Sequence, residues 1–184
     1  MPPLYLRIAA RIDRFSDLTG RTLCWLTLLM VVIGAWNAVA RKTDRLTGFH
    51  LSSNAFIELQ WYMFSVIFLL GAAYTLRHGE HVRVDVLYGR LSEKAQAWIN
   101  VVGTLIFLFP FCALMIWVSM PSVINSWKVW EISNDPGGLP RYPIKTMVPI
   151  AFLLLAVQGL SELFKNLAVI LGHTGDRERE ADHG

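Results

Sequence analysis

Residues 95–127 read AQAWINVVGTLIFLFPFCALMIWVSMPSVINSW, 33 positions without a charged side chain. As one helix this stretch would be about 50 Å long, since each residue adds about 1.5 Å. A helix needs about 20 mainly apolar residues to cross a hydrocarbon core of about 30 Å. The stretch is therefore more than long enough to span a bilayer. We expect it to tilt, to bend at Pro110 or to project from the membrane, and to stop near Pro121.

Three further stretches have the same character. Residues 22–40 and 59–76 carry no charge, and the stretch from about 146 to 171 is interrupted only by Glu162 and Lys165. Hydrophobic residues make up 54% of the 184-residue chain and charged residues 17%, which is far from the balance of a soluble domain. The sequence therefore predicts an all-α integral membrane protein with four transmembrane helices and additional amphipathic interfacial helices.

The predicted organisation has three parts. Residues 1–21 form an N-terminal amphipathic or interfacial segment, residues 22–171 a four-helix membrane domain, and residues 172–184 a polar C-terminal tail. Within the membrane domain we expect four spans, at about 22–40, 57–76, 97–120 and 146–168. We also expect an interfacial helix at about 84–91.

The positive charges indicate how the chain is oriented. If the amino terminus is cytoplasmic, eleven of the 17 Lys and Arg residues lie in cytoplasmic segments and six lie outside. Membrane proteins carry an excess of Lys and Arg in their cytoplasmic loops. Both termini are therefore expected to face the cytoplasm.

The segment before the first span is amphipathic. Its apolar positions share one helical face: Leu4, Ile8, Ile12, Phe15 and Leu18. Its arginines recur every seven residues along the flank of that face: Arg7, Arg14 and Arg21. Such a helix lies in the headgroup plane with its arginines near lipid phosphates. A plain extension of the first span fits the pattern nearly as well.

No pattern of residues predicts an enzyme. Cys24 and Cys112 fall inside predicted spans, and the sequence has no nucleotide-binding motif, no metal-spaced cysteine set and no paired nucleophile and base. Haem in a membrane anchor is held by histidines within the spans, whereas all five histidines lie in predicted loops or tails. The net charge of +3 reflects basic loops rather than a nucleic-acid-binding face. We therefore expect no catalysis, no cofactor, no metal and no nucleic acid.

The predicted spans carry no charge at mid-membrane depth. Ionisable side chains are costly in lipid, so those that occur there are the usual candidates for ion or proton pathways. Here Glu58 lies at the outer end of the second span, and Glu162 and Lys165 can pair with each other near the inner surface. The sequence therefore gives no indication of an ion or substrate pathway of its own.

Two separated blocks of sequence resemble one known family. The first is ELQWY at 58–62 with GAAYTLRHGEHVRVDVLY at 71–88, and the second is EISNDPGGLP at 131–140 with PIK at 143–145 and QGLSE at 158–162. In order and spacing these blocks resemble the DctQ-type small membrane subunit of TRAP transporters, the tripartite ATP-independent periplasmic systems. The resemblance covers about residues 12–171. These blocks identify a family better than a substrate.

The resemblance implies a role. It implies a multi-pass protein of the bacterial inner membrane that scaffolds a large DctM-type membrane subunit. In such systems a periplasmic binding protein delivers an organic anion, typically a carboxylate, and uptake is coupled to sodium. The large subunit holds the substrate and sodium sites and moves, while the small subunit braces it. The transported substrate is not indicated by the sequence.

The same blocks supply candidate contacts with the partner or with lipid: Glu58, Trp61, Arg77, His81, Arg83 and Asp85. The four residues after the second span are expected to form a hydrogen-bonded corner on the cytoplasmic side, although solvated loop charges explain them equally well. Glu58 is expected to pair with a basic residue of the partner or of the outer loop, or to act as an acid at a helix start. Two other classes stay open: a membrane-anchor subunit of a redox complex, and a self-contained small transporter or channel.

Overall fold

A computed structural model describes residues 3–48, 51–79, 89 and 91–172. In chain order its helices are α1 (Leu4–Thr47), α2 (Asn54–His78), α4 (Glu93–Gly103), the π-helical turn η1 (Thr104–Leu108), α5 (Phe109–Lys128) and α6 (Tyr142–Ile170). Within the described residues there is no β-strand, only one isolated bridge between Ile132 and Pro140. Four helices are long and apolar enough to cross a membrane: α1, α2, the continuous α4–η1–α5 and α6. The predicted all-α membrane fold is confirmed.

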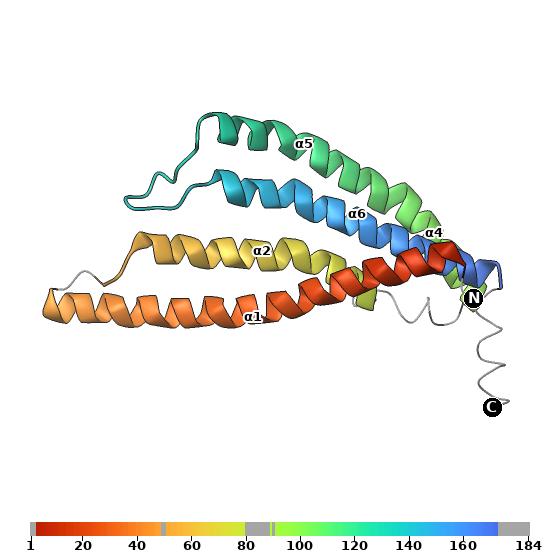
Figure 1. Ribbon diagram of the computed structural model, residues 1–184, viewed down its shortest axis with the longest axis horizontal. Coiled ribbons are helices and arrows are strands. Elements are labelled where there is room, and N and C mark those ends of the chain that lie inside the picture. The colour runs from red at the N-terminus through yellow and green to blue at the C-terminus, as the bar shows by residue number, and fades with distance from the viewer. Residues whose placement is uncertain (1–2, 49–50, 80–88, 90, 173–184) are drawn as a thin grey trace, which may run out of the picture.

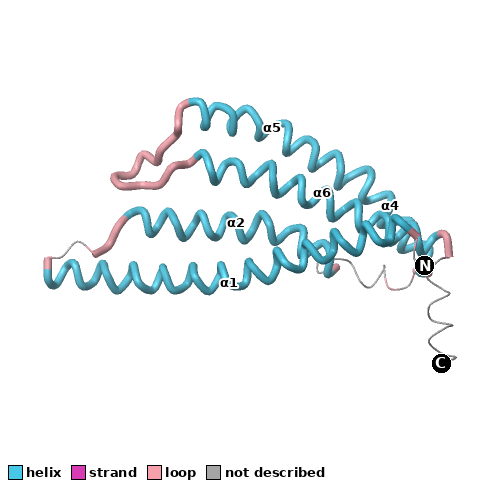
Figure 2. The backbone as a smooth tube through the Cα atoms, in the orientation of Figure 1, coloured by secondary structure: helices cyan, strands magenta, loops and turns pink. Residues whose placement is uncertain are grey.

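The central helix of the bundle is α6 (Figures 1 and 2). It packs against α1, α2, α4 and α5, whereas α1 packs mainly against α2. The start of α1 and the end of α6 lie at the same end of the molecule, which we call the terminal end. At the opposite loop end lie the turn between α1 and α2 and the connection between α5 and α6.

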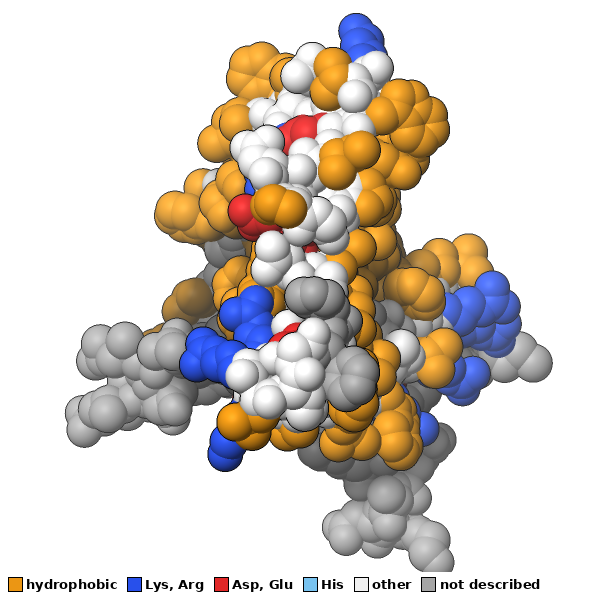
Figure 3. Space-filling model, turned by 90° about the vertical axis from the view of Figure 1, so that its left-hand side faces the viewer, with side chains coloured by type: hydrophobic (Ala, Val, Ile, Leu, Met, Phe, Trp, Pro, Cys, Tyr) orange, Lys and Arg blue, Asp and Glu red, His pale blue; other side chains and the backbone are white. Residues whose placement is uncertain are grey.

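The lateral surface of the bundle is hydrophobic. Large side chains on all its sides are more than two-thirds exposed: Trp25 (73%), Phe68 (71%), Phe107 (73%) and Trp117 (76%). Figure 3, which looks at the loop end, shows hydrophobic side chains along the flanks of the molecule. Soluble monomers rarely expose apolar surface on this scale, because water disfavours it. The surface is suited to lipid or to a membrane partner.

The first helix joins two predicted parts of the chain. α1 continues without a break for 44 residues, about 66 Å at 1.5 Å per residue. The amphipathic segment is therefore an extension of the first apolar stretch and not a separate helix. Its inner side packs on α6, where Ala9 and Ser16 are buried and the rings of Tyr5 and Phe164 lie 6.2 Å apart. Its placement in the headgroup plane stays a prediction.

Glycines of α1 allow α2 to approach closely. A Cβ atom added at Gly20 would lie 2.2 Å from the Tyr74 ring, and one added at Gly34 would lie 2.2 Å from the Gln60 amide nitrogen. Small residues at such contacts let helix backbones approach in a membrane, where packing rather than water drives helix association. On α2, Ala73 is buried in the same interface.

The long third stretch bends through a π-helical turn. In η1 the N–H of Phe109 donates to the carbonyl of Thr104, five residues earlier. Pro110 follows at once and has no N–H to give, so a widened turn accommodates its ring. Gly159 of α6 faces this turn, where an added Cβ atom would lie 2.4 Å from the Leu108 side chain. The π-helical turn therefore packs closely against a glycine of the central helix.

One expectation about this stretch is wrong. The helix does not stop near Pro121 but includes it and ends at Lys128. A proline removes one backbone hydrogen bond, and membrane helices tolerate that loss when nearby turns and neighbours adjust. The predicted interfacial helix at 84–91 falls almost entirely outside the described residues.

Candidate functional site

The structure separates the candidate residues into two groups. Glu58 and Trp61 lie near the start of α2 and Arg77 lies in its last turn. Arg77 lies nineteen positions after Glu58, which corresponds to about 28 Å along a helix. Three further candidates lie outside the described residues: His81, Arg83 and Asp85. Among the described candidates there is therefore no single site but one cluster at each end of the bundle.

At the loop end, Glu58 is buried beneath the hairpin that joins α5 to α6, residues 129–141. Its side chain is 3% exposed. One carboxylate oxygen accepts a hydrogen bond from the Ser133 hydroxyl and the other accepts one from the Leu139 backbone N–H. Gly138 also lies against this carboxylate, because a Cβ atom there would be 2.8 Å from Glu58 Oε2. The carboxylate therefore fixes the hairpin on α2, and we call this arrangement the Glu58 cluster.

The hairpin has its own internal bonds. The Ser133 N–H donates to the Leu139 carbonyl at 3.1 Å, and the Arg141 N–H donates to the Glu131 carbonyl at 2.8 Å. The Tyr62 hydroxyl of α2 donates to the Pro140 carbonyl at 3.1 Å. These bonds close the loop around the Glu58 carboxylate and leave little freedom to its backbone.

Two cations complete the loop end, Arg141 at the end of the hairpin and Lys145 in α6. Arg141 donates to the Ser133 hydroxyl oxygen at 3.3 Å. Lys145 forms an ion pair with Glu131, and its hydrogen bond holds the pKa of the Glu131 carboxyl below its usual value. Within the described residues no cation lies within 4.0 Å of the Glu58 carboxylate. In this chain Glu58 thus binds a hydroxyl and an amide rather than a basic side chain of the loop.

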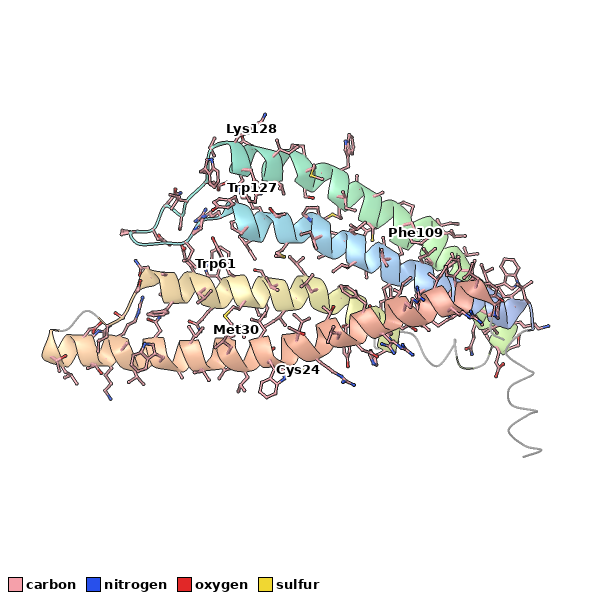
Figure 4. All side chains as sticks on the ribbon, viewed as in Figure 1. Cys24, Met30, Trp61, Phe109, Trp127 and Lys128 are labelled. Atoms are coloured by element: carbon pink, nitrogen blue, oxygen red, sulfur yellow. The ribbon has the colours of Figure 1, made fainter. Side chains whose placement is uncertain are left out.

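Aromatic side chains surround the same end. The rings of Trp127, Trp130 and Tyr142 contact one another at centroid distances of 4.5 to 6.0 Å, and the Trp127 indole N–H donates to the Thr146 hydroxyl at 2.9 Å. Trp61 packs edge-on against Tyr62 at 4.5 Å and stays 42% exposed. Figure 4 shows Trp61 on α2 and Trp127 at the end of α5. Tryptophan and tyrosine are enriched at membrane boundaries, where one side of the ring is apolar and the other is wet.

At the terminal end, Arg77 is bound to α1. Its guanidinium donates to the backbone carbonyl of Asp13 and forms an ion pair with Asp17. The guanidinium Nε also lies 4.0 Å from the Asp13 carboxylate, and His78 Nε2 lies 3.8 Å from the Asp17 carboxylate. Arg77 thus has its hydrogen-bond acceptor and its ion-pair partner within this chain.

The Asp13 carboxylate joins α1 to α6. Its Oδ1 accepts hydrogen bonds from Gln158 Nε2 at 3.0 Å and from the Ser161 hydroxyl at 2.7 Å. Its Oδ2 accepts one from Lys165 Nζ at 3.2 Å. The Ser16 hydroxyl donates to Gln158 Oε1 at 2.6 Å, and the Gln158 and Ser161 side chains are completely buried. We call this arrangement, with Arg77 and Asp17, the Asp13 network.

The predicted pair within α6 is confirmed. Lys165 and Glu162 form an ion pair three residues apart. Sequence reasoning did not assign Asp13, Gln158 or Ser161 to a site. The signal was present, because residues 158, 161, 162 and 165 fall on one face of a helix. What the two clusters do is mechanical: they join helix to helix and helix to hairpin. Among the described residues no group of three or more His, Cys, Asp or Glu side chains is placed to hold a metal.

The Glu58 cluster predicts a local effect of Glu58→Gln. The uncharged amide keeps the shape but offers the Leu139 N–H a poorer acceptor, because hydrogen bonds to a charged group are stronger than those to a neutral one. We expect hydrogen exchange of the hairpin amides to rise by about tenfold or more, with Asp135→Asn in the same hairpin as the control. Equal protection in both variants would rule the cluster out as the hairpin's anchor.

The Asp13 network predicts a global effect of Asp13→Asn. The asparagine keeps one oxygen to accept from Gln158 and Ser161, but it puts an amide NH2 in place of the oxygen that accepts from Lys165 and removes the negative charge. We therefore expect a loss of about 1–3 kcal/mol of stability. Thermal unfolding of the purified protein in detergent measures it. Glu93→Gln removes the same charge at an exposed position of α4 and is the control. If both variants unfold at the same temperature, the network does not stabilise the fold.

The sequence of the chain matches a known protein family. The family model for the DctQ component of tripartite ATP-independent periplasmic transporters matches residues 30–169. That range contains the Glu58 cluster and the α6 part of the Asp13 network, but it begins after Asp13 and Asp17. No solved structure matches the chain.

A curated relative carries the same description. It is the ectoine TRAP transporter small permease protein TeaB of Halomonas elongata, 29% identical over 141 residues that cover 76% of this chain and 70% of the relative. These matches make the chain a transporter subunit rather than an enzyme or a redox anchor, and a multi-pass protein of the bacterial inner membrane. Since the family model matches about three-quarters of its residues, the chain belongs to the DctQ family, the small permease subunits of TRAP transporters.

Proposed function

We propose that this small permease subunit is a static scaffold for a large DctM-type membrane subunit. The large subunit carries the substrate and sodium sites, and a periplasmic binding protein delivers the cargo, an organic anion with a carboxylate. The observation that supports the scaffold role is that polar clusters join the helices at both ends of the bundle.

The two clusters oppose sliding or tilting of one helix against another. The Asp13 network joins α1, α2 and α6 at the terminal end, and the Glu58 cluster joins α2 to the hairpin at the loop end. Separating a largely buried charge from its partners costs several kcal/mol, and more in surroundings without water. A subunit that moved internally during transport would have to break these contacts in every cycle. This favours a rigid body.

Between the clusters the helices carry no charged side chain. The segments 22–40, 59–76, 95–127 and 146–161 contain no Asp, Glu, Lys, Arg or His. Ionisable groups within the membrane are the usual marks of a transport pathway. The pathway is therefore proposed to lie in the large subunit, against the exposed apolar flanks of this chain.

We propose that the terminal end lies in the cytoplasm and the loop end in the periplasm, which the excess of Lys and Arg near the terminal end supports. The hairpin then faces the side on which the binding protein docks. Its exposed side chains include Trp130 and Ile132, at 62% and 64%. Trp130 has a φ of +48°, a backbone conformation that bulky residues rarely adopt and that the surrounding contacts hold in place. We propose that this fixed hairpin adds to the docking surface.

The candidate residues divide between two roles. Arg77 is proposed to hold α2 on α1, since both of its acceptors are in this chain. Contact with the large subunit or with lipid phosphate is proposed for His81, Arg83 and Asp85, and Trp61 is proposed as an exposed contact near the loop end. Glu58 is proposed to act through the hairpin that it holds.

The cargo is proposed only as a chemical class. The relative's name assigns ectoine to its own transporter, and at 29% identity that assignment does not extend to this chain. A scaffold that does not touch the cargo leaves specificity to the large subunit and to the binding protein.

Reconstitution tests the proposal. We expect sodium-driven uptake into proteoliposomes that contain both membrane subunits, with the binding protein outside, and none with either subunit alone. Transport by this chain alone would contradict the scaffold role, and so would full transport without it.

Charge reversal at Arg83 is expected to lower co-purification of the large subunit, with Lys42→Glu in the first long helix as the control.

A further inference from the structure

A cavity of about 300 Å³ opens between α2, α4 and α6 at the terminal end. A cavity of about 10–15 Å³ already holds one water molecule, so this one has room for a small headgroup. Its walls are partly apolar and partly polar: Leu76, Ile99, Leu108 and Gly103, with Asn100, Thr104, Glu162 and Asn166. Neither the family nor the proposed scaffold role assigns it a function.

The polar wall presents acceptors. Asn166 Nδ2 donates to the backbone carbonyl of Glu162 at 2.7 Å, which fixes the orientation of that amide because a carbonyl only accepts. Asn166 Oδ1 then accepts from Asn100 Nδ2 at 3.1 Å. The Asn100 amide is oriented in turn, and its Oδ1 is left as an acceptor. Among the described residues nothing donates to Asn100 Oδ1, and the bonds to the Glu162 carboxylate all use Oε1.

The charged side chain that lines this cavity is an acid, Glu162. Glu162 shares Lys165 with Asp13, at the edge of the Asp13 network. The linked ion pairs comprise three carboxylates, of Asp13, Asp17 and Glu162, and two cations, of Arg77 and Lys165. One negative charge is thus left over when His78 is neutral. A ligand that donates hydrogen bonds and carries one positive charge matches both features.

The cavity lies at the depth of lipid headgroups. Trp98, two residues before Asn100, is 55% exposed on α4, and tryptophan of this kind marks the boundary between lipid and water. Leu76 of the wall directly precedes Arg77 and His78, the last residues of α2. The apolar part of the wall can therefore contact hydrocarbon next to a charged headgroup.

We propose that this cavity binds the primary ammonium of an aminophospholipid, a lipid with an ethanolamine-type headgroup. The ammonium donates to Glu162 Oε2 and to Asn100 Oδ1, and its methylene groups pack on Leu76 and Ile99. A choline headgroup has no N–H to donate. A glycerol headgroup carries no positive charge. The cavity therefore discriminates between headgroups and not between acyl chains.

Native mass spectrometry of the full-length chain measures this preference. The delipidated protein is mixed with phosphatidylethanolamine, phosphatidylcholine or phosphatidylglycerol of identical acyl chains. Because hydrogen bonds to charged groups are strong, we expect at least about tenfold tighter retention of one phosphatidylethanolamine molecule. Equal retention of the choline lipid would overturn the proposal.

A cavity-filling variant separates ligand loss from misfolding. A Cβ atom added at Gly103 meets no atom within 4 Å, so Gly103→Leu places its side chain in open space and replaces a poor helix former. We expect it to abolish the ethanolamine preference without lowering the melting temperature of the delipidated protein. Ala113→Leu, at an exposed position of α5, adds the same bulk elsewhere and is expected to keep the preference.

Two polar variants test the acceptors. Asn100→Leu and Glu162→Gln are each expected to lower the retention of phosphatidylethanolamine by about tenfold, toward that of phosphatidylcholine. Retention of the preference in Gly103→Leu or in both polar variants would contradict the proposal. So would loss of the bound lipid on assembly with the large subunit, together with a cross-link from Glu162 to a lysine of that subunit, because a protein side chain would then be the occupant.

Discussion

The fold depends on one constraint of the membrane: a polar group buried away from water has to find its partner inside the protein. Asp13 meets that constraint twice. Its carboxylate accepts from three donors of α6, and its backbone carbonyl accepts from Arg77 of α2. Hydrocarbon provides no hydrophobic force between helices, so packing and such polar contacts decide how they associate. In this bundle they bring the ends of three helices together.

At the loop end the same constraint fixes the hairpin between α5 and α6 rather than a helix. A buried carboxylate has four lone-pair positions to satisfy, and Glu58 meets its need with a hydroxyl and a backbone amide of one hairpin. The hairpin is consequently fixed by a residue 75 positions away in sequence. Between the two ends the side chains are uncharged and mostly apolar, which fits a subunit whose flanks face lipid and a partner. This geometry fits the structural role proposed for the subunit.

Much of this was accessible from the sequence. The charge-free stretches predicted four membrane helices, since length and hydropathy decide that question locally, and the blocks at 58–88 and 131–162 indicated the family. The ion pair of Glu162 and Lys165 followed from helical spacing. The continuation of the helix past Pro121 was missed, because neighbours compensate for a proline in ways that spacing does not reveal. The partners of Asp13 and Glu58 were missed for a similar reason: they lie up to 152 positions away and depend on which helices pack together.

Distance measurement during transport tests the scaffold role most directly. Spin labels at exposed positions of α1 and α5, such as Lys42→Cys and Asn125→Cys in a chain without Cys24 and Cys112, report on the loop end of the bundle. A rigid scaffold predicts one distance distribution that is the same with and without sodium and cargo in the assembled transporter. A distribution that shifts by several ångströms between these states would show that the helices of this chain move in the cycle and would contradict the account.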